Sequence, residues 1–391
     1  MNSLDILLAF LPVALLIVLP LLTNVRLAAL VALAVTSGLY FWWQAPVPFY
    51  FASLAASVIS TLNILMIVFG AVFLFEIMQA SGYIGRINAS LAGIHPAREV
   101  RFFLVAIGLT GFFEGVAGFG TPGAIVPLLL ISMGFRPLFS VVSVLLLDGF
   151  FAAFGAVGTP LLAGLALPLN LTDAVTAAIA INAAWMLAAA ALPVLGFIAW
   201  QYQQQENQIG QKGTVLVLFA AAIIPFVGFA YLVPEFTTIL ASVSMLVISV
   251  LIVTGGKPRL DLKPWLPYAG LVVLLLLPKL IAPLGRVLDL ELRWEPIFAT
   301  TVAAALKPLR SPLIPFVVVA LVFGGSRSHY GPSLKSAGKK VLAVALVLFP
   351  VIAVAQLMLT SGVNRPSMIA VIAEAFSYAG QGYVALAPFI G

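Results

Sequence analysis

Long apolar runs separated by short polar segments follow one another along almost the whole chain. A helix that crosses a bilayer core needs about 20 predominantly apolar residues. The pattern therefore predicts an all-α polytopic integral membrane protein of roughly 10–12 transmembrane helices. Two stretches, 102–134 and 138–169, are longer and are interrupted by glycines. The other candidate spans are 6–22, 27–43, 57–78, 174–200, 214–233, 237–253, 265–283, the short 312–323, 341–359 and 367–379.

The basic residues are divided unequally between the two sides of these predicted spans. Of the 19 Lys and Arg residues, 13 fall in loops on one side and 6 on the other. Cytoplasmic loops carry an excess of Lys and Arg. The richer side is therefore predicted to be cytoplasmic, with the N-terminus outside, in a multi-pass protein of the cytoplasmic (inner) membrane.

This orientation constrains the two interrupted stretches. Arg101 and Arg136 flank 102–134, and both are expected on the cytoplasmic side. Its 33 residues extend about 50 Å as a helix, whereas two crossings need about 60 Å. We therefore predict a re-entrant hairpin that turns at 115–123. The stretch 138–169 starts inside and ends outside, so it is predicted to be one spanning helix broken at 155–160.

A faint internal repeat links 76–82, Glu-Ile-Met-Gln-Ala-Ser-Gly, with 356–362, Gln-Leu-Met-Leu-Thr-Ser-Gly. The first copy ends inside and the second outside, which is the inverted topology of many secondary transporters. We expect one transporter domain over 1–391, with a first repeat at about 57–200 and a second from about 340 onward. The same offset carries Gly118 beyond Gly391, so the second repeat is expected to be truncated at 391. The alternative is a chance match.

Composition excludes several other classes of protein. Only 8% of the residues are charged and 63% are hydrophobic, too few charges to cover a soluble surface. There is no cysteine, and the two histidines, His95 and His329, are expected in separate loops. No metal-ligand spacing or nucleophile motif is present, so we expect no enzyme, metal or cofactor. The net charge of +6 does not indicate nucleic-acid binding, because the Lys and Arg residues lie between apolar spans, where they set the orientation in the membrane.

Two glycine-rich segments are candidate substrate sites. Glycines let the backbone leave helical geometry and approach a ligand closely. A proline in the first turn of the following helix leaves free N–H groups and a positive dipole end, which suit a carboxylate. Close helix packing by small residues is the alternative. The candidate residues are Gly115, Gly118, Gly120, Thr121 and Gly123 in the first segment, and Gly155, Gly158 and Thr159 in the second.

Two carboxyl groups within the apolar stretches are candidate proton carriers. Glu114 precedes the first glycine segment, at a depth where a charge costs on the order of 3 kcal/mol or more. It is expected either to carry a transported proton or to cap backbone N–H groups of the same loop. Asp148 lies seven residues before Gly155. Proton relay, hydrogen bonding to the second break and a buried ion pair are all open for it.

The glycine segments resemble those of a known family. Segment 112–124, Phe-Phe-Glu-Gly-Val-Ala-Gly-Phe-Gly-Thr-Pro-Gly-Ala, closely resembles the signature loop of the lactate permease family, as does 153–161, Ala-Phe-Gly-Ala-Val-Gly-Thr-Pro-Leu. Segments 68–87 and 361–391 fit the runs before the first and last signatures. The family is typically longer, with a further break beyond this chain's end, and Asp148-Gly149 stands where an uncharged polar pair is expected.

The resemblance implies a proton-coupled symporter of lactate or a similar short monocarboxylate such as glycolate. It also implies an elevator-like fold with inverted repeats, and substrate contacts around Gly118, Gly120, Thr121, Gly155, Gly158 and Thr159. The expected partners are a small carboxylate anion, a proton and the lipid bilayer, with a homodimer as a further candidate. The alternatives are a sodium-coupled or dicarboxylate transporter, a membrane scaffold and an intramembrane enzyme.

Overall fold

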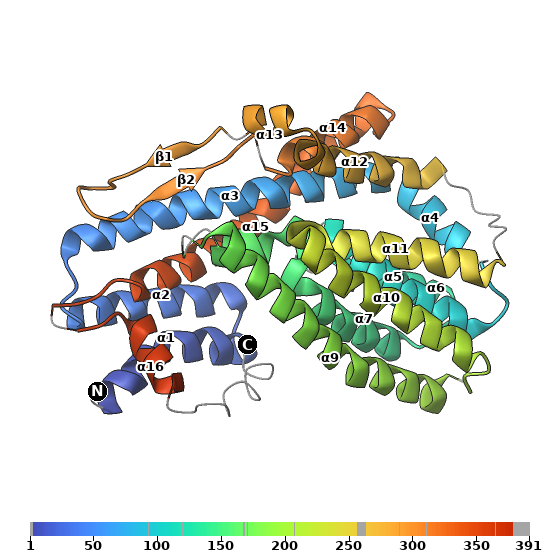
Figure 1. Ribbon diagram of the computed structural model, residues 1–391, viewed down its shortest axis with the longest axis horizontal. Helices are drawn as coiled ribbons and strands as arrows, with labels where there is room; N and C mark the ends of the chain where they lie inside the picture. Colours follow the sequence, from blue (N-terminus) through green and yellow to red (C-terminus); the bar gives the residue numbers. More distant parts are fainter. Residues whose placement is uncertain are drawn as a thin grey trace. The chain divides into compact units, whose positions relative to one another are not determined.

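The computed structural model describes residues 3–92, 94–116, 118, 121–166, 169, 171–206, 208–255, 263–288, 290–309, 311–363 and 365–377 (Figure 1). Helices account for most of them. Two compact units are formed: unit 1 comprises Met1–Met66, Arg286–Ser311 and Gly338–Gly391, and unit 2 comprises Ile67–Gly285 and Pro312–Ala337. Because α3 (Val47–Ala80) and α15 (Tyr330–Met358) extend across the unit boundaries in the sequence, each contributes residues to both units.

In the described part of the chain, eight helical segments are long and apolar enough to cross a membrane. Three shorter apolar helices, α6 (Thr121–Ser132), α12 (Leu266–Leu280) and α14 (Leu313–Phe323), accompany them. These helices confirm the prediction of an all-α polytopic membrane protein.

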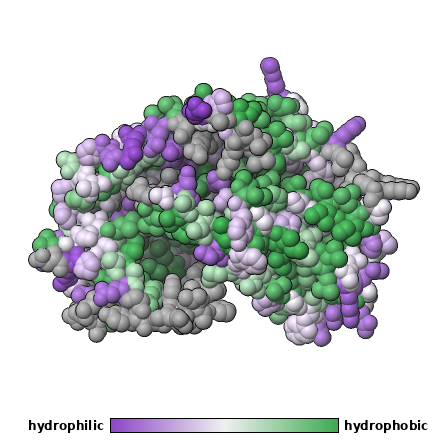
Figure 2. Space-filling view, viewed as in Figure 1, coloured by the Kyte–Doolittle hydropathy of each residue, from purple (hydrophilic) through white to green (hydrophobic). Residues whose placement is uncertain are grey.

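The outer surface of unit 2 is suited to lipid. Figure 2 shows large hydrophobic areas over its helices. Side chains that a soluble protein would bury are exposed there, because lipid tails rather than water are their expected neighbours. Among the most exposed are Leu138, Leu145, Leu192, Leu216 and Ile224.

Unit 1 combines the helices α1 (Ser3–Leu22), α2 (Val25–Trp42) and α16 (Met368–Ser377) with a small hairpin that the sequence analysis did not predict. Strand β1 (Leu292–Trp294) pairs antiparallel with β2 (Ala304–Leu306), with Arg293 opposite Ala305. The hairpin is exposed or half-buried and carries ion pairs, so its short strands lack the apolar alternation that identifies a strand in sequence.

Unit 2 is a helical bundle built around α5 (Arg98–Val116). Every residue of α5 from Glu99 onward is buried except Arg101, which is half-buried. It contacts α6, α7 (Pro137–Phe151), α10 (Lys212–Leu232) and α11 (Thr237–Val253), while α9 (Asp173–Gln205) packs on α7 and α10 (Figure 1). The remaining elements of the unit are α4 (Tyr83–Ala92), α8 (Gly155–Thr159), α13 (Ala282–Leu288, partly in this unit) and the short turns η1 (Ala152–Phe154), η2 (Pro160–Ala166), η3 (Pro234–Phe236), η4 (Lys263–Trp265) and η5 (Arg327–His329).

The predicted hairpin in 102–134 is present as α5, a break and α6. The two helices pack against each other. At the end away from the break they are connected by Arg98, whose guanidinium donates to the carbonyl oxygen of Gly134. The helix α6 has only 12 residues, about 18 Å, which is too short for a full crossing. The length and pairing of the helices fit a hairpin that enters and leaves on one side.

Some helices are longer than their apolar runs. The run at 57–78 lies within α3, which begins ten residues earlier at Val47. The added segment contains Ser53, whose carbonyl oxygen accepts a 2.6 Å hydrogen bond from the Ser57 hydroxyl. Such bonds to the preceding turn let small polar residues lie inside an apolar helix without an unsatisfied hydroxyl. Hydropathy therefore underestimated the length of this helix.

Candidate functional site

The first glycine-rich segment forms a break between α5 and α6. Gly118 has a φ of +58°, a left-handed conformation that glycine adopts without strain. Its N–H donates to the carbonyl oxygen of Phe113 over 3.2 Å, which ends α5. Its own carbonyl oxygen accepts from the N–H of Thr121 over 3.0 Å, which starts α6. Pro122 occupies the first turn, so the positive dipole end of α6 faces the break.

The second segment forms a sharper break after α7. Ala156, Val157 and Gly158 have φ values of 43°, 57° and 70°. A left-handed conformation costs about 1–2 kcal/mol for a non-glycine residue. The Thr159 hydroxyl donates to the carbonyl oxygen of Ala156 and closes the bend, and helical structure resumes at Pro160. The predicted break at 155–160 is therefore confirmed, and strain at buried residues is typical of functional sites.

The two breaks lie against each other. A Cβ placed on Gly118 would come within 2.7 Å of the Cβ of Ala156. Only a residue without a side chain at 118 allows the backbones to approach this closely. Two predicted segments that are 38 residues apart in sequence thus form one buried site in unit 2.

A third element, which the sequence analysis did not assign to the site, covers the breaks. The turn η3 joins α10 to α11, and a Cβ on Gly158 would lie 2.7 Å from the Cα of Glu235. The hydroxyl of Thr238 donates over 2.9 Å to the carbonyl oxygen of Phe151, at the end of α7. A Cβ on Gly115 would lie 2.6 Å from the backbone N of Ile239. The signal in the sequence is the acidic Glu235 between two apolar spans.

The two predicted proton carriers are brought together beside the breaks. Glu114 is buried, with 5% of its surface exposed, and Asp148 on α7 is half-buried. Their carboxyl groups lie close enough to each other to interact. A Cβ on Gly155 would overlap the Glu114 carboxyl group, which therefore lies directly on the backbone of the second break.

The remaining predicted site residues have other surroundings. Gly123 faces α7, where a Cβ would lie 3.1 Å from Leu145. Thr121 is half-buried at the start of α6. Gly120 lies outside the described residues. The structure thus brings together Gly115, Gly118, Thr121, Gly155, Gly158, Thr159, Glu114 and Asp148.

Charged residues gather at the opposite end of α5. Arg98 forms an ion pair with Glu206 over 3.0 Å, and the other carboxylate oxygen of Glu206 accepts from the N–H of Arg136 over 2.7 Å. Nearby, Glu99 accepts from the N–H of Gln211 over 2.9 Å. The helix ends that the charge count assigned to one side therefore meet in the folded unit.

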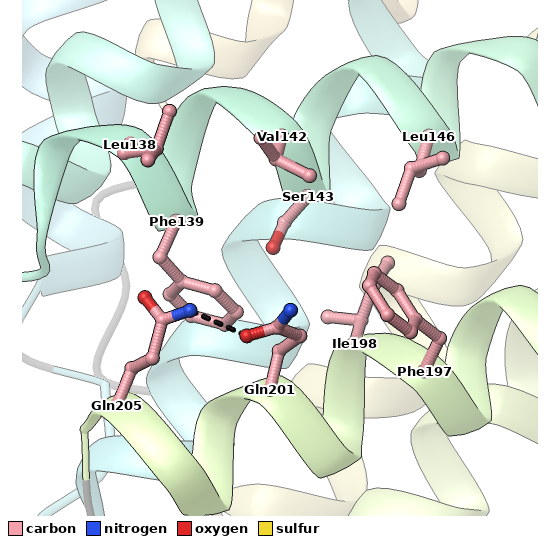
Figure 3. A pocket seen from close by; sticks show the side chains of 9 residues that line it. All are labelled: Leu138, Phe139, Val142, Ser143, Leu146, Phe197, Ile198, Gln201 and Gln205. Atoms are coloured by element: carbon pink, nitrogen blue, oxygen red, sulfur yellow. Dashed lines mark hydrogen bonds between the residues drawn. The ribbon is translucent and has the colours of Figure 1, made fainter.

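A small cavity of about 100 Å³ lies between α7 and α9, away from the breaks (Figure 3). Its walls are mostly apolar, with Phe139 and Phe197 among them. The polar groups are Ser143 and a hydrogen-bonded pair formed by Gln201 and Gln205. None of the described residues that line it has an ionisable side chain, so they offer no charged group to hold an anion.

Comparisons with known proteins agree with the motifs. Residues 5–260 match the sequence profile of the L-lactate permease family. An L-lactate permease of Halalkalibacterium halodurans is 31% identical over 208 residues, which is 50% of this chain and 36% of the relative. An L-lactate permease of Escherichia coli is 36% identical over 96 residues, 25% of this chain and 17% of the relative. The glycolate permease GlcA of Escherichia coli is 34% identical over 123 residues, 31% of this chain and 22% of the relative.

These matches cover about a third or less of the length of the relatives, and no solved structure matches the chain. The profile match nevertheless extends from α1 to the end of α11 and includes both glycine breaks. It also agrees with the expectation that the chain is not an enzyme. The chain belongs to the L-lactate permease family.

Proposed function

We propose that this chain is a secondary transporter that carries L-lactate or a similar short monocarboxylate, such as glycolate, together with a proton. The main support for the proposal is that two glycine breaks lie against each other beside the carboxyl groups of Glu114 and Asp148. The relatives named as lactate and glycolate permeases support the substrate class.

The substrate carboxylate would bind at the breaks. Backbone N–H groups at a helix start and the positive dipole end of α6 favour a negative charge there. Gly118 and Gly158 let the backbone approach the ligand because neither has a side chain in the way. Glu114 and Asp148 would supply the coupled proton, which offsets the charge of the anion during the crossing.

The proposed orientation is in the cytoplasmic membrane with the N-terminus outside. The end of unit 2 that contains Arg98, Arg136 and Lys212 would then face the cytoplasm. The start of α9 at Asp173 would face outward. The inverted repeat expected from the sequence suits an elevator-like transporter, and a homodimer is the assembly proposed for it.

Uptake of labelled L-lactate into proteoliposomes tests this function. An inward proton gradient should drive accumulation above equilibrium, and unlabelled glycolate should compete whereas succinate should not. Accumulation driven only by a sodium gradient, or competition only by succinate, would instead support the sodium-coupled or dicarboxylate alternative. No uptake under either gradient would contradict transport by this chain and leave the scaffold alternative.

A further inference from the structure

The carboxyl groups of Glu114 and Asp148 contact each other although they come from different helices. Glu114 is near the end of α5, and Asp148 is one turn before the end of α7. Two of their oxygens, Oε2 of Glu114 and Oδ1 of Asp148, are buried and find no donor among the described residues. Two ionised carboxylates have only acceptors, so the contact has no donor unless one group is protonated.

Among the described residues, no ion pair joins Glu114 or Asp148 to a basic side chain. Around Glu114, α5 contacts α3, α6, α7, α8, α11 and α12. Three of the ionisable groups on this side, Glu76 of α3, Tyr268 of α12 and Glu235 of η3, are not cationic. The basic residues of the contacting helices are three or more helical turns away along the chain: Arg98, Arg101, Arg136, Lys212 and Lys279. A further basic residue, Lys263, lies in η4, two residues before Trp265, whose ring contacts that of Phe112.

We propose that Glu114 and Asp148 form a single proton-binding site in which the two carboxyl groups share one proton. Two adjacent carboxylates in an apolar surrounding cannot both remain ionised, whereas one shared proton supplies the missing donor and leaves a single negative charge. The pair then titrates as a unit, and neither residue is the proton carrier by itself. This differs from two independent carriers, because each carboxyl group needs the other to hold the proton.

A change in the protonation of this site would act directly on the second glycine break. The Glu114 carboxyl group rests on Gly155, where any other residue would overlap it. Gly155 begins the strained turn that contains Ala156, Val157 and Gly158. Loss of the shared proton would drive the two carboxylates apart, and the movement of Glu114 would press on this backbone. This part of the inference rests on the proposed function, since it assumes that the breaks hold the substrate.

Infrared difference spectra of the purified full chain near neutral pH test the shared proton without any transport. Glu114→Gln and Asp148→Asn keep the shape and the net charge of the pair while removing one of the two carboxyl groups that share the proton. Both differences, wild type minus each variant, should show the same carbonyl band of one protonated carboxylic acid. Survival of the band in D148N, or its absence from the wild type, would overturn the proposal. Because Asp148 is half-buried, D148N is expected to fold, and it tests the proposal even if E114Q does not fold.

L-lactate binding by the same proteins separates this inference from the proposed function. In the wild type, the affinity should change with pH, whereas in both amide variants the change should be lost. If the wild type shows the shared band but does not bind lactate, the proposed function is contradicted, whereas the shared proton is supported. Lactate binding whose pH dependence persists in D148N would overturn the shared site and leave the permease proposal standing.

Discussion

At the scale of single residues, the second break depends on Gly158, where both the backbone conformation and the close packing require a glycine. Gly158 has a φ of +70°, and its missing side chain leaves room for the backbone of Glu235. The left-handed conformation alone costs an alanine about 1–2 kcal/mol. The clash is with backbone atoms, which cannot rotate away as a flexible side chain can.

We expect Gly158→Ala to lower the free energy of unfolding by about 2 kcal/mol or more, from backbone strain and overpacking together. Gly149→Ala is the matched control, because Gly149 lies in α7 and a Cβ there meets nothing within 4 Å. That control should be neutral or stabilising by about 0.5–1 kcal/mol. Unfolding in mixed micelles measures both. Equal stability of the two variants would contradict the close contact with η3.

The proton carriers give a second prediction at this scale. Glu114→Gln should abolish accumulation of L-lactate against its gradient, because the pair can no longer gain and lose a proton. Exchange of lactate across the membrane should continue at a reduced rate, since exchange needs no net proton movement. Proteoliposome uptake and counterflow measure the two activities. Unchanged accumulation driven by a pH gradient would remove Glu114 from the coupling step.

At the scale of elements, the end of the α5–α6 hairpin away from the break is stabilised by one acidic side chain, Glu206. Glu206 accepts from both the Arg98 guanidinium and the Arg136 backbone. The Glu206 side chain is only 5% exposed, whereas that of Arg98 is 43% exposed. Loss of Glu206 therefore leaves a backbone donor and a guanidinium without their acceptor.

Glu206→Ala should cost about 1–3 kcal/mol of unfolding free energy, because a backbone donor loses its partner. Arg98→Ala should lower the free energy of unfolding by no more than about 1 kcal/mol through loss of the exposed ion pair. Loss of the hydrogen bond to the Gly134 carbonyl oxygen adds to this effect. Unfolding in mixed micelles compares the two variants. A larger loss in R98A than in E206A would show that the guanidinium, and not the carboxylate, organises this end.

The elements also show which parts of the fold the sequence could predict. The hairpin at 102–134 and the break at 155–160 follow from local signals, because glycine and proline impose their conformations on their neighbours. The position of η3 over Gly158 depends on how α10 and α11 pack, and hydropathy contains no information on that. The contact between Glu114 and Asp148 was missed for the same reason. Each residue was identified from its depth, but their pairing depends on tertiary packing.

At the scale of the whole molecule, the charge distribution predicts one orientation in the membrane. The expected inverted repeat, from about 57–200 and from about 340 onward, stays a prediction, because residues 378–391 lie outside the described part of the chain. The orientation, by contrast, can be measured directly. The chain contains no cysteine, so a single introduced thiol is a specific label site.

Asp173→Cys and Lys212→Cys place one thiol at the start of α9 or of α10, both at exposed positions. A membrane-impermeant maleimide should label the thiol at 173 in intact cells. The thiol at 212 should react only after the membrane is opened. The reverse pattern would invert the orientation, and labelling of both positions in intact cells would contradict the predicted crossing by α9.

The most direct test of the account is proton movement driven by lactate. Proteoliposomes that contain the full chain and an internal pH-sensitive dye would receive L-lactate on the outside, with sodium absent and a control series without protein. The account predicts rapid internal acidification that depends on the protein and is lost in both Glu114→Gln and Asp148→Asn. Entry of labelled lactate without protein-dependent acidification, or acidification that persists in both variants, would contradict it.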